Sequence, residues 1–264
     1  MATTTRIREG VHNLTAAQVT DFREAYRKMQ AISDNRSYGF LAGLHGAPAF
    51  WCWHHERNPA HNPGVRMQLF LPWHRAYLYN WEMSMRDRVP NVTLPWWDWT
   101  LRPPRQNGVP KIFADRNANN QPNPLFSFHI NVGGSQPINH NTTRDPGDPT
   151  DLPTQAKVEA VVATEDWTDF NFQLEDVHDS VHGWVGGDMG VVATSAYDPI
   201  FWSHHCMIDR IWWLYQVRNG NGNIPDNLLD VVLKPFNFKV RDVLNVNDLG
   251  YDYAANQTII PIGG

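Results

Sequence analysis

The chain has 264 residues, of which 42% are hydrophobic, and a formal net charge of -5 at pH 7. This composition suffices for a globular core, and the mild acidity argues against nucleic acid as a partner, because phosphate binding requires a basic surface. No stretch approaches the roughly 20 apolar residues of a membrane helix. The N-terminus also lacks the apolar segment of a secretory signal, so we expect a cytoplasmic protein, with export alongside a separate partner left open.

Helical periodicity appears in five segments in chain order. In the first, about 15–32, Thr15 and Gln18 have the spacing of a capping box. Helices are also predicted over about 73–86, in a short segment after Thr154, and over about 168–184. The last, 198–217, opens with Asp198-Pro199, which suits an N-cap and the first helical position. Residues 101–153, rich in Pro, Asn and Gly, predict a long loop. We expect one mainly α domain, residues 1–264, with its helices packed as a bundle.

Histidines are clustered in the second half of the chain. His178 and His182 are four residues apart, so on a helix both rings lie on one face and can reach one metal ion. His204 and His205 follow in an aromatic-rich predicted helix, where a polar ring without a partner is costly. Asp209, four residues beyond His205, is expected to hold that imidazole in one orientation.

The first half carries a matching set of histidines, namely His45, His54, His55, His61 and His74. Two clusters that can each supply three imidazoles predict a binuclear metal site. Imidazole ligands suit copper or zinc, and affinity is highest for copper. The His-Glu-x-x-His motif of zinc proteases is absent, and the two cysteines are too few for a Cys-rich zinc finger. The residues thus favour two copper ions over two zinc ions, with a zinc hydrolase as an alternative.

Several motifs resemble the type-3 copper family, which includes tyrosinases, catechol oxidases, o-aminophenol oxidases and molluscan haemocyanins. The residues that carry the resemblance are Leu71-Pro72-Trp73-His74-Arg75, His178-x-x-x-His182, Asp198-Pro199-x-Phe201-Trp202-x-His204-His205-x-x-x-Asp209-Arg210 and Tyr251-Asp252-Tyr253. The resemblance covers about residues 8–253 and implies a four-helix bundle around a binuclear copper site, with long loops and few short strands. It suggests a bacterial member of the family.

The resemblance also implies the copper ligands. The first copper would be held by His45, His54 and His74, and the second by His178, His182 and His205. The interval of 20 residues between His54 and His74 is longer than in the family, which leaves His61 as a rival ligand.

Other positions match residues that tune the family's sites. Cys52-x-His54 is similar to the motif in which some members form a thioether, with a plain buried thiol as the alternative. Glu175 and Asp179 match positions that hold and activate an ordered water, with a solvated acidic patch as the alternative. Val192 and Gly183 match positions near the entrance of the second copper site, where small side chains favour access. Arg6 or Arg8 is expected to stack on the closing tyrosines.

The implied function is oxidation of o-diphenols, and of o-aminophenols, to quinones or quinone imines by O₂, with hydroxylation of monophenols left open. The alternative is a haemocyanin-like oxygen carrier without turnover. The implied partners are a small phenolic substrate and O₂, with no nucleic acid and no membrane, and copper loading by a separate chaperone is left open. Since the chain ends soon after Tyr253, we expect no C-terminal shielding domain. The oligomeric state does not follow from the sequence.

Overall fold

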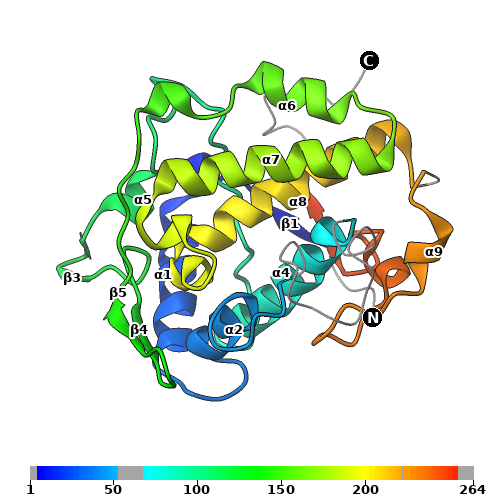
Figure 1. The fold of residues 1–264 in the computed structure, drawn as a ribbon. Coiled ribbons are helices and arrows are strands. Elements are labelled where there is room, and N and C mark those ends of the chain that lie inside the picture. Colours follow the sequence, from blue (N-terminus) through cyan, green and yellow to red (C-terminus); the bar gives the residue numbers. More distant parts are fainter. Residues whose placement is uncertain (1–4, 53–67, 222, 255–264) are drawn as a thin grey trace.

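The computed structural model describes residues 5–52, 68–221 and 223–254, and within these ranges the protein is mainly helical. The longer helices are α1 (Ala16–Gln30), α2 (Tyr38–His45), α4 (Phe70–Arg86), α6 (Gln155–Val162), α7 (Trp167–Val185) and α8 (Ile200–Asn219). Single-turn helices are α5 (Lys111–Ala114) and α9 (Asp226–Leu229). The predicted fold class, a helical bundle with long loops and few short strands, is confirmed (Figure 1).

The helices that carry the histidines form the centre of the molecule. α4 packs against α8, and α7 contacts both of them. The rings of Trp81 and Trp202 stack between α4 and α8 with their centroids 3.4 Å apart. Both rings are fully buried, so the core lies directly against the helices that hold the histidine clusters.

Local signals explain where most helices begin. Thr15 caps α1 through the predicted capping box with Gln18. Thr154 caps α6, and Asp166 caps α7 by accepting a hydrogen bond from the amide of Asp169. α8 begins at Ile200, one residue after the predicted first helical position, although Asp198 Oδ1 still accepts a hydrogen bond from the Ile200 amide. α4 begins at Phe70, three residues earlier than predicted.

In the described ranges, the strands form three short pairs. β1 (Arg6–Arg8) runs parallel to β6 (Tyr251–Tyr253), β2 (Asn117–Ala118) pairs with β3 (Gln121–Pro122), and β4 (His129–Val132) pairs with β5 (Ile138–Asn141). The last two pairs lie within the predicted long loop, which therefore contains local structure. The β1–β6 pair joins the two ends of the described chain beside α8 (Figure 1).

Candidate metal centre

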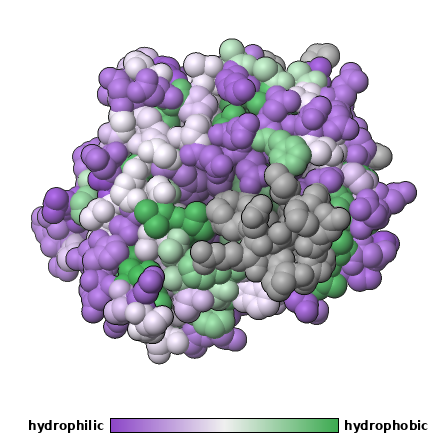
Figure 2. Space-filling model, viewed as in Figure 1, coloured by the Kyte–Doolittle hydropathy of each residue, from purple (hydrophilic) through white to green (hydrophobic). Residues whose placement is uncertain are grey.

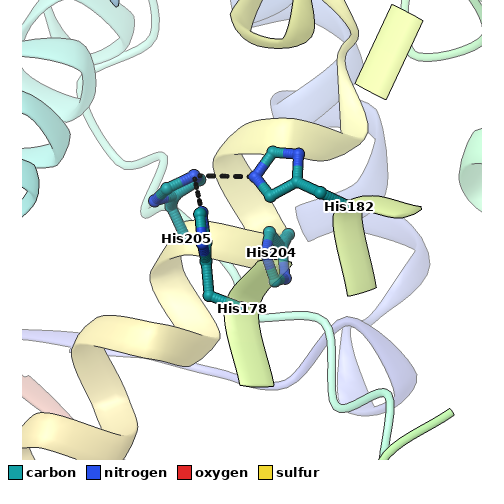
Figure 3. A group of neighbouring side chains, drawn as sticks. All are labelled: His178, His182, His204 and His205. Carbon is teal, nitrogen blue, oxygen red and sulfur yellow. Dashed lines mark hydrogen bonds between the residues drawn. The ribbon is translucent and has the colours of Figure 1, made fainter. Parts of the chain in front are cut away.

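Four imidazoles from two helices meet at the centre of the bundle. His178 and His182 lie on α7, and His204 and His205 lie on α8 (Figure 3). One nitrogen atom of each ring lies within 4.8 Å of the others. The four-residue spacing on α7 therefore directs both rings toward α8, as the sequence predicted.

The ring nitrogens of three of these histidines are spaced as ligands of one metal ion would be. His205 Nε2 lies 3.1 Å from His178 Nε2 and 3.2 Å from His182 Nε2. Nitrogens that share a tetrahedral metal lie about 3.3 Å apart, because each metal–nitrogen bond is about 2.0 Å long. The residues present therefore fit a metal ion bound by His178, His182 and His205.

Hydrogen bonds to Nδ1, the ring nitrogen that faces away from His205, fix the tautomers of His178 and His182. His178 Nδ1 donates to Asp179 Oδ1 at 2.9 Å, and His182 Nδ1 donates to the Met189 carbonyl at 2.7 Å. Protonation at Nδ1 leaves the Nε2 lone pairs of both residues directed at His205. A metal ion between the three rings would bind both lone pairs together with that of a neutral His205, so these tautomers fit the same metal site.

A second group of imidazoles adjoins the first. His45 ends α2, His74 lies on α4, and the ligand nitrogens of His45, His74 and His205 lie within 4.8 Å of one another. His74 Nδ1 donates to the Phe70 carbonyl at 2.8 Å, so Nε2 carries the lone pair that can bind a metal. Because His205 belongs to both groups, the two sites are adjacent, as a binuclear centre requires.

Gly46 explains how His45 reaches this centre. A Cβ atom at Gly46 would lie 2.4 Å from the Val192 carbonyl oxygen and 2.5 Å from that of Ala193. The next amide, that of Ala47, donates to the Ala193 carbonyl at 3.0 Å. The absence of a side chain at Gly46 thus lets the 192–193 segment pack against the end of α2 and position His45.

The remaining predicted ligand of the first metal lies outside the described residues, as does its rival. His54 and His61 both fall in the 53–67 gap. Cys52 is buried, and its sulfur lies 3.7 Å from His74 Nε2. This contact places the thiol beside the first histidine group, and the Cys52–His54 thioether stays a prediction.

Copper content distinguishes the two candidate ligands of the first site. We expect His54→Ala to reduce bound copper from about two ions to about one per chain, because loss of a ligand weakens metal binding by well over tenfold. His61→Ala should retain both ions, as measured by elemental analysis after dialysis. The reverse pattern would assign the ligand role to His61.

Burial keeps the central histidines neutral. The pKa values of His204 and His205 are both lowered well below the usual range, first by burial and then by neighbouring histidines. A neutral imidazole is the form that binds a metal. His204 is fully buried, and among the described residues neither of its ring nitrogens has a hydrogen-bond partner. Its ring stacks on that of His178, with 5.2 Å between the centroids.

The predicted contact between Asp209 and His205 is wrong. His205 Nδ1 has no hydrogen-bond partner within the described ranges. Asp209 instead accepts hydrogen bonds from Arg75 Nε at 2.5 Å and Arg8 Nη1 at 3.2 Å. It also accepts from the hydroxyl groups of Tyr251 and Tyr253 (2.8 and 2.5 Å).

The expected stacking of an N-terminal arginine on the closing tyrosines is confirmed. The Arg8 guanidinium lies 3.6 Å from the centre of the Tyr251 ring. The buried Arg8 and Arg75 thus bind the Asp209 carboxylate in place of His205. These contacts, with those of Tyr251 and Tyr253, link β1, β6 and α4 to α8.

A pocket leads from the surface to the histidines. Its cavity volume is about 260 Å³, and it is lined by His45, His178, Asp179, His182, Gly183, Met189, Gly190, Val192 and Ser195. Gly183 and Val192 both line it, and their role in substrate access stays a prediction. A Cβ atom at Gly183 would contact nothing within 4 Å. No sequence pattern indicated that Met189 and Ser195 also line the pocket.

The two predicted acidic residues occupy different places. Asp179 lines the pocket, whereas Glu175 lies on α7 one turn before His178, is half-buried, and is not among the residues that line it. The pKa of Glu175 is raised to about 8 by burial and by the nearby Asp179 and Asp176.

The common central domain of tyrosinase matches residues 35–218. The chain belongs to the tyrosinase family of type-3 copper proteins. Two haemocyanins are among its similar proteins. The chain is 28% identical over 246 residues to units G and H of Sepia officinalis haemocyanin, covering 85% of this chain and 40% of that protein. It is 30% identical over 283 residues to beta-C chain unit G of Helix pomatia haemocyanin, covering 94% of this chain and 65% of that protein. The chain thus spans less than two thirds of the length of either haemocyanin.

Solved structures of type-3 copper proteins share the fold. A functional unit of octopus haemocyanin superposes with a TM-score of 0.77 at 28% identity, covering 94% of this chain and 68% of that one. A tyrosinase from Burkholderia thailandensis gives a TM-score of 0.78 at 24% identity, covering 95% and 74% of the two chains. Membership of this type-3 copper family implies a dicopper site. Among the described helices, none is long and apolar enough to cross a membrane.

Proposed function

We propose that this type-3 copper protein is an oxidase that converts o-diphenols, and also o-aminophenols, to quinones or quinone imines with O₂. The observation that carries the proposal is the pocket, which opens onto His45, His178 and His182. Its volume of about 260 Å³ accommodates one aromatic ring with a small substituent. Gly183, Gly190 and Val192 line it with little bulk, so a phenol can approach the imidazole groups.

The proposed ligands follow the two histidine groups. His178, His182 and His205 would hold one copper, and His45 and His74, together with His54, would hold the other. Two bound copper ions would supply the redox chemistry, which is electron transfer from the phenol to O₂. Overall, two o-diphenol molecules give up four electrons and four protons, one O₂ molecule is reduced, and two quinones and two water molecules result.

The protein's own groups would bind the substrate and handle its protons. Met189 and Val192 offer apolar contacts to the substrate ring. Asp179 accepts the hydrogen bond from His178 and lines the pocket, so it can polarise a pocket water molecule, which takes a proton from a phenol hydroxyl group at the floor. We propose that Glu175, one turn away, anchors a water molecule that relays this proton.

A specific observation favours the oxygen carrier as the second candidate. The two similar proteins described above are haemocyanins. A carrier would use the same histidines and bind O₂ reversibly without consuming it. The open pocket favours the oxidase, because a carrier has no need of a path for an aromatic ring.

Oxygen consumption separates the two candidates. With copper-loaded protein and a simple catechol, we expect continuous O₂ uptake at about 1 per second or faster, a common enzyme rate. The matching monophenol, run in parallel, reports whether hydroxylation also occurs. Reversible O₂ binding with no uptake in the presence of catechols or o-aminophenols would identify a carrier instead.

A further inference from the structure

The exposure of the lining residues distinguishes the floor of the pocket from its mouth. His45 and His178 are each 1% exposed and form its floor. The side chain of Asp179 is 63% exposed and lies at its mouth. An aromatic ring whose hydroxyl groups point at the floor therefore directs its opposite edge, and any substituent there, toward the mouth.

Asp179 gives this mouth a negative charge. The described residues that line the pocket include no lysine, no arginine and no second carboxylate. Two further acidic residues, Glu175 and Asp176, lie on the same helix within one turn of Asp179. Figure 2 shows hydrophilic surface over α7 with hydrophobic surface beside it. Among the residues that line the pocket, Met189 and Val192 are apolar. The lining thus combines apolar side chains with the single carboxylate of Asp179.

The Asp179 carboxylate is held in place and remains accessible. Its Oδ1 accepts the hydrogen bond from His178 Nδ1 at 2.9 Å, which fixes the orientation of the carboxylate. The exposed remainder of the carboxylate faces solvent at the mouth. A cationic group that arrives there gains both Coulomb attraction and a charge-assisted hydrogen bond.

We propose that Asp179 selects among phenolic substrates by charge, favouring those with an amino-bearing cationic side chain opposite the reacting hydroxyl groups and disfavouring those with a carboxylate there. This inference rests on the proposed oxidase function for its biological meaning, while the selection itself is a property of binding. An exposed ion pair changes affinity by a few-fold. Attraction of the cation and repulsion of the anion together give an expected preference of about tenfold.

Three catechols whose substituents differ in charge test the proposal on copper-loaded protein. They carry a 2-aminoethyl, an ethyl or a 2-carboxyethyl group at position 4. Their dissociation constants are measured without oxygen by tryptophan fluorescence, and their kcat/KM values by O₂ uptake. In the wild-type protein, we expect affinity to fall in the order amine, ethyl, carboxylate.

Asp179→Asn removes the charge with little change of shape, because the amide oxygen can still accept the hydrogen bond from His178. The preference for the amine over the carboxylate should fall from about tenfold to less than about twofold. Asp176→Asn, which removes an exposed charge of the same helix that does not line the pocket, is the matched control. It should retain most of the preference.

Each result decides a separate point. Equal affinity for the amine and the carboxylate in the wild-type protein, or an unchanged preference in Asp179→Asn, would overturn charge selection. If no catechol causes O₂ uptake but the binding order holds, the oxidase proposal fails and charge selection stands. If the ethyl compound causes O₂ uptake but the catechols bind without any charge preference, the oxidase proposal stands and charge selection is refuted.

Discussion

Replacement of His205 by alanine should disrupt both metal sites. His205 Nε2 lies 3.1 Å from His178 Nε2, and His205 is the one histidine that occurs in both groups of described ligands. We expect the second copper to be lost, the affinity for the first to fall by about tenfold or more, and catechol oxidation to become undetectable. Elemental analysis after dialysis against a weak chelator measures the copper content.

An exposed histidine provides the control for this experiment. His129 is exposed on β4, and its Nδ1 contacts only the side chain of Asn141 among the hydrogen bonds described. His129→Ala should therefore keep normal copper content and activity. If His205→Ala also kept both copper ions, the assignment of His205 as a ligand would be wrong, and His204, whose ring lies within the same group, would be the next residue to replace.

Replacement of Asp209 by asparagine should cause the largest loss of stability. Its carboxylate is almost completely buried and pairs with two guanidinium groups, those of Arg8 and Arg75. Removal of one partner from a buried charge network leaves the others uncompensated, so we expect the free energy of unfolding to fall by about 3–5 kcal/mol. Urea unfolding at fixed copper loading measures the change.

Asp230 offers a matched surface comparison. It also pairs with two cations, Lys239 and Arg241, but its side chain is 64% exposed. Solvent screens such pairs, so Asp230→Asn should leave the urea midpoint nearly unchanged. A similar midpoint for the two variants would show that the buried network contributes no more than a surface ion pair.

Acid should narrow the difference between wild type and Asp209→Asn. Burial alone would raise the pKa of Asp209, but Arg75 and Arg8 outweigh burial and lower it. A carboxylate with a lowered pKa in the folded state contributes its stability above its unfolded pKa of about 3.9, and loses it as the pH falls through the folded value. The stability gap should thus be full at neutral pH and shrink below about pH 4.

Local signals predicted much of the fold and the site. The capping box at Thr15 and the caps at Thr154 and Asp166 are short-range hydrogen bonds, and the helices that follow them match or nearly match the periodic segments. The i, i+4 pair His178 and His182 converges because helix geometry alone determines which face both rings occupy. These features depend only on residues close together in the chain.

Features that depend on distant residues could not be predicted. α2 contains two glycines and is buried on nearly every side, so Tyr38–His45 shows no amphipathic period. The spacing of His205 and Asp209 suggested a contact, but Arg8 and Arg75 come from remote segments to bind the carboxylate instead. Ser195 and Met189 reach the pocket through short 3₁₀ segments, Ser195–Tyr197 and Gly187–Gly190, whose placement no local pattern specifies.

The pairing of β1 with β6 affects when, during and after translation, the protein can fold and bind copper. Arg8 and the Tyr253 hydroxyl group are hydrogen-bonded across 245 positions of sequence, and both bind the carboxylate of Asp209 on α8. The ribosome must therefore have synthesised the strand Tyr251–Tyr253 before the helix that carries His205 can complete its packing. We expect copper capture at both sites to follow translation of this strand, since a nascent chain that ends earlier lacks the contacts that hold α8 in place.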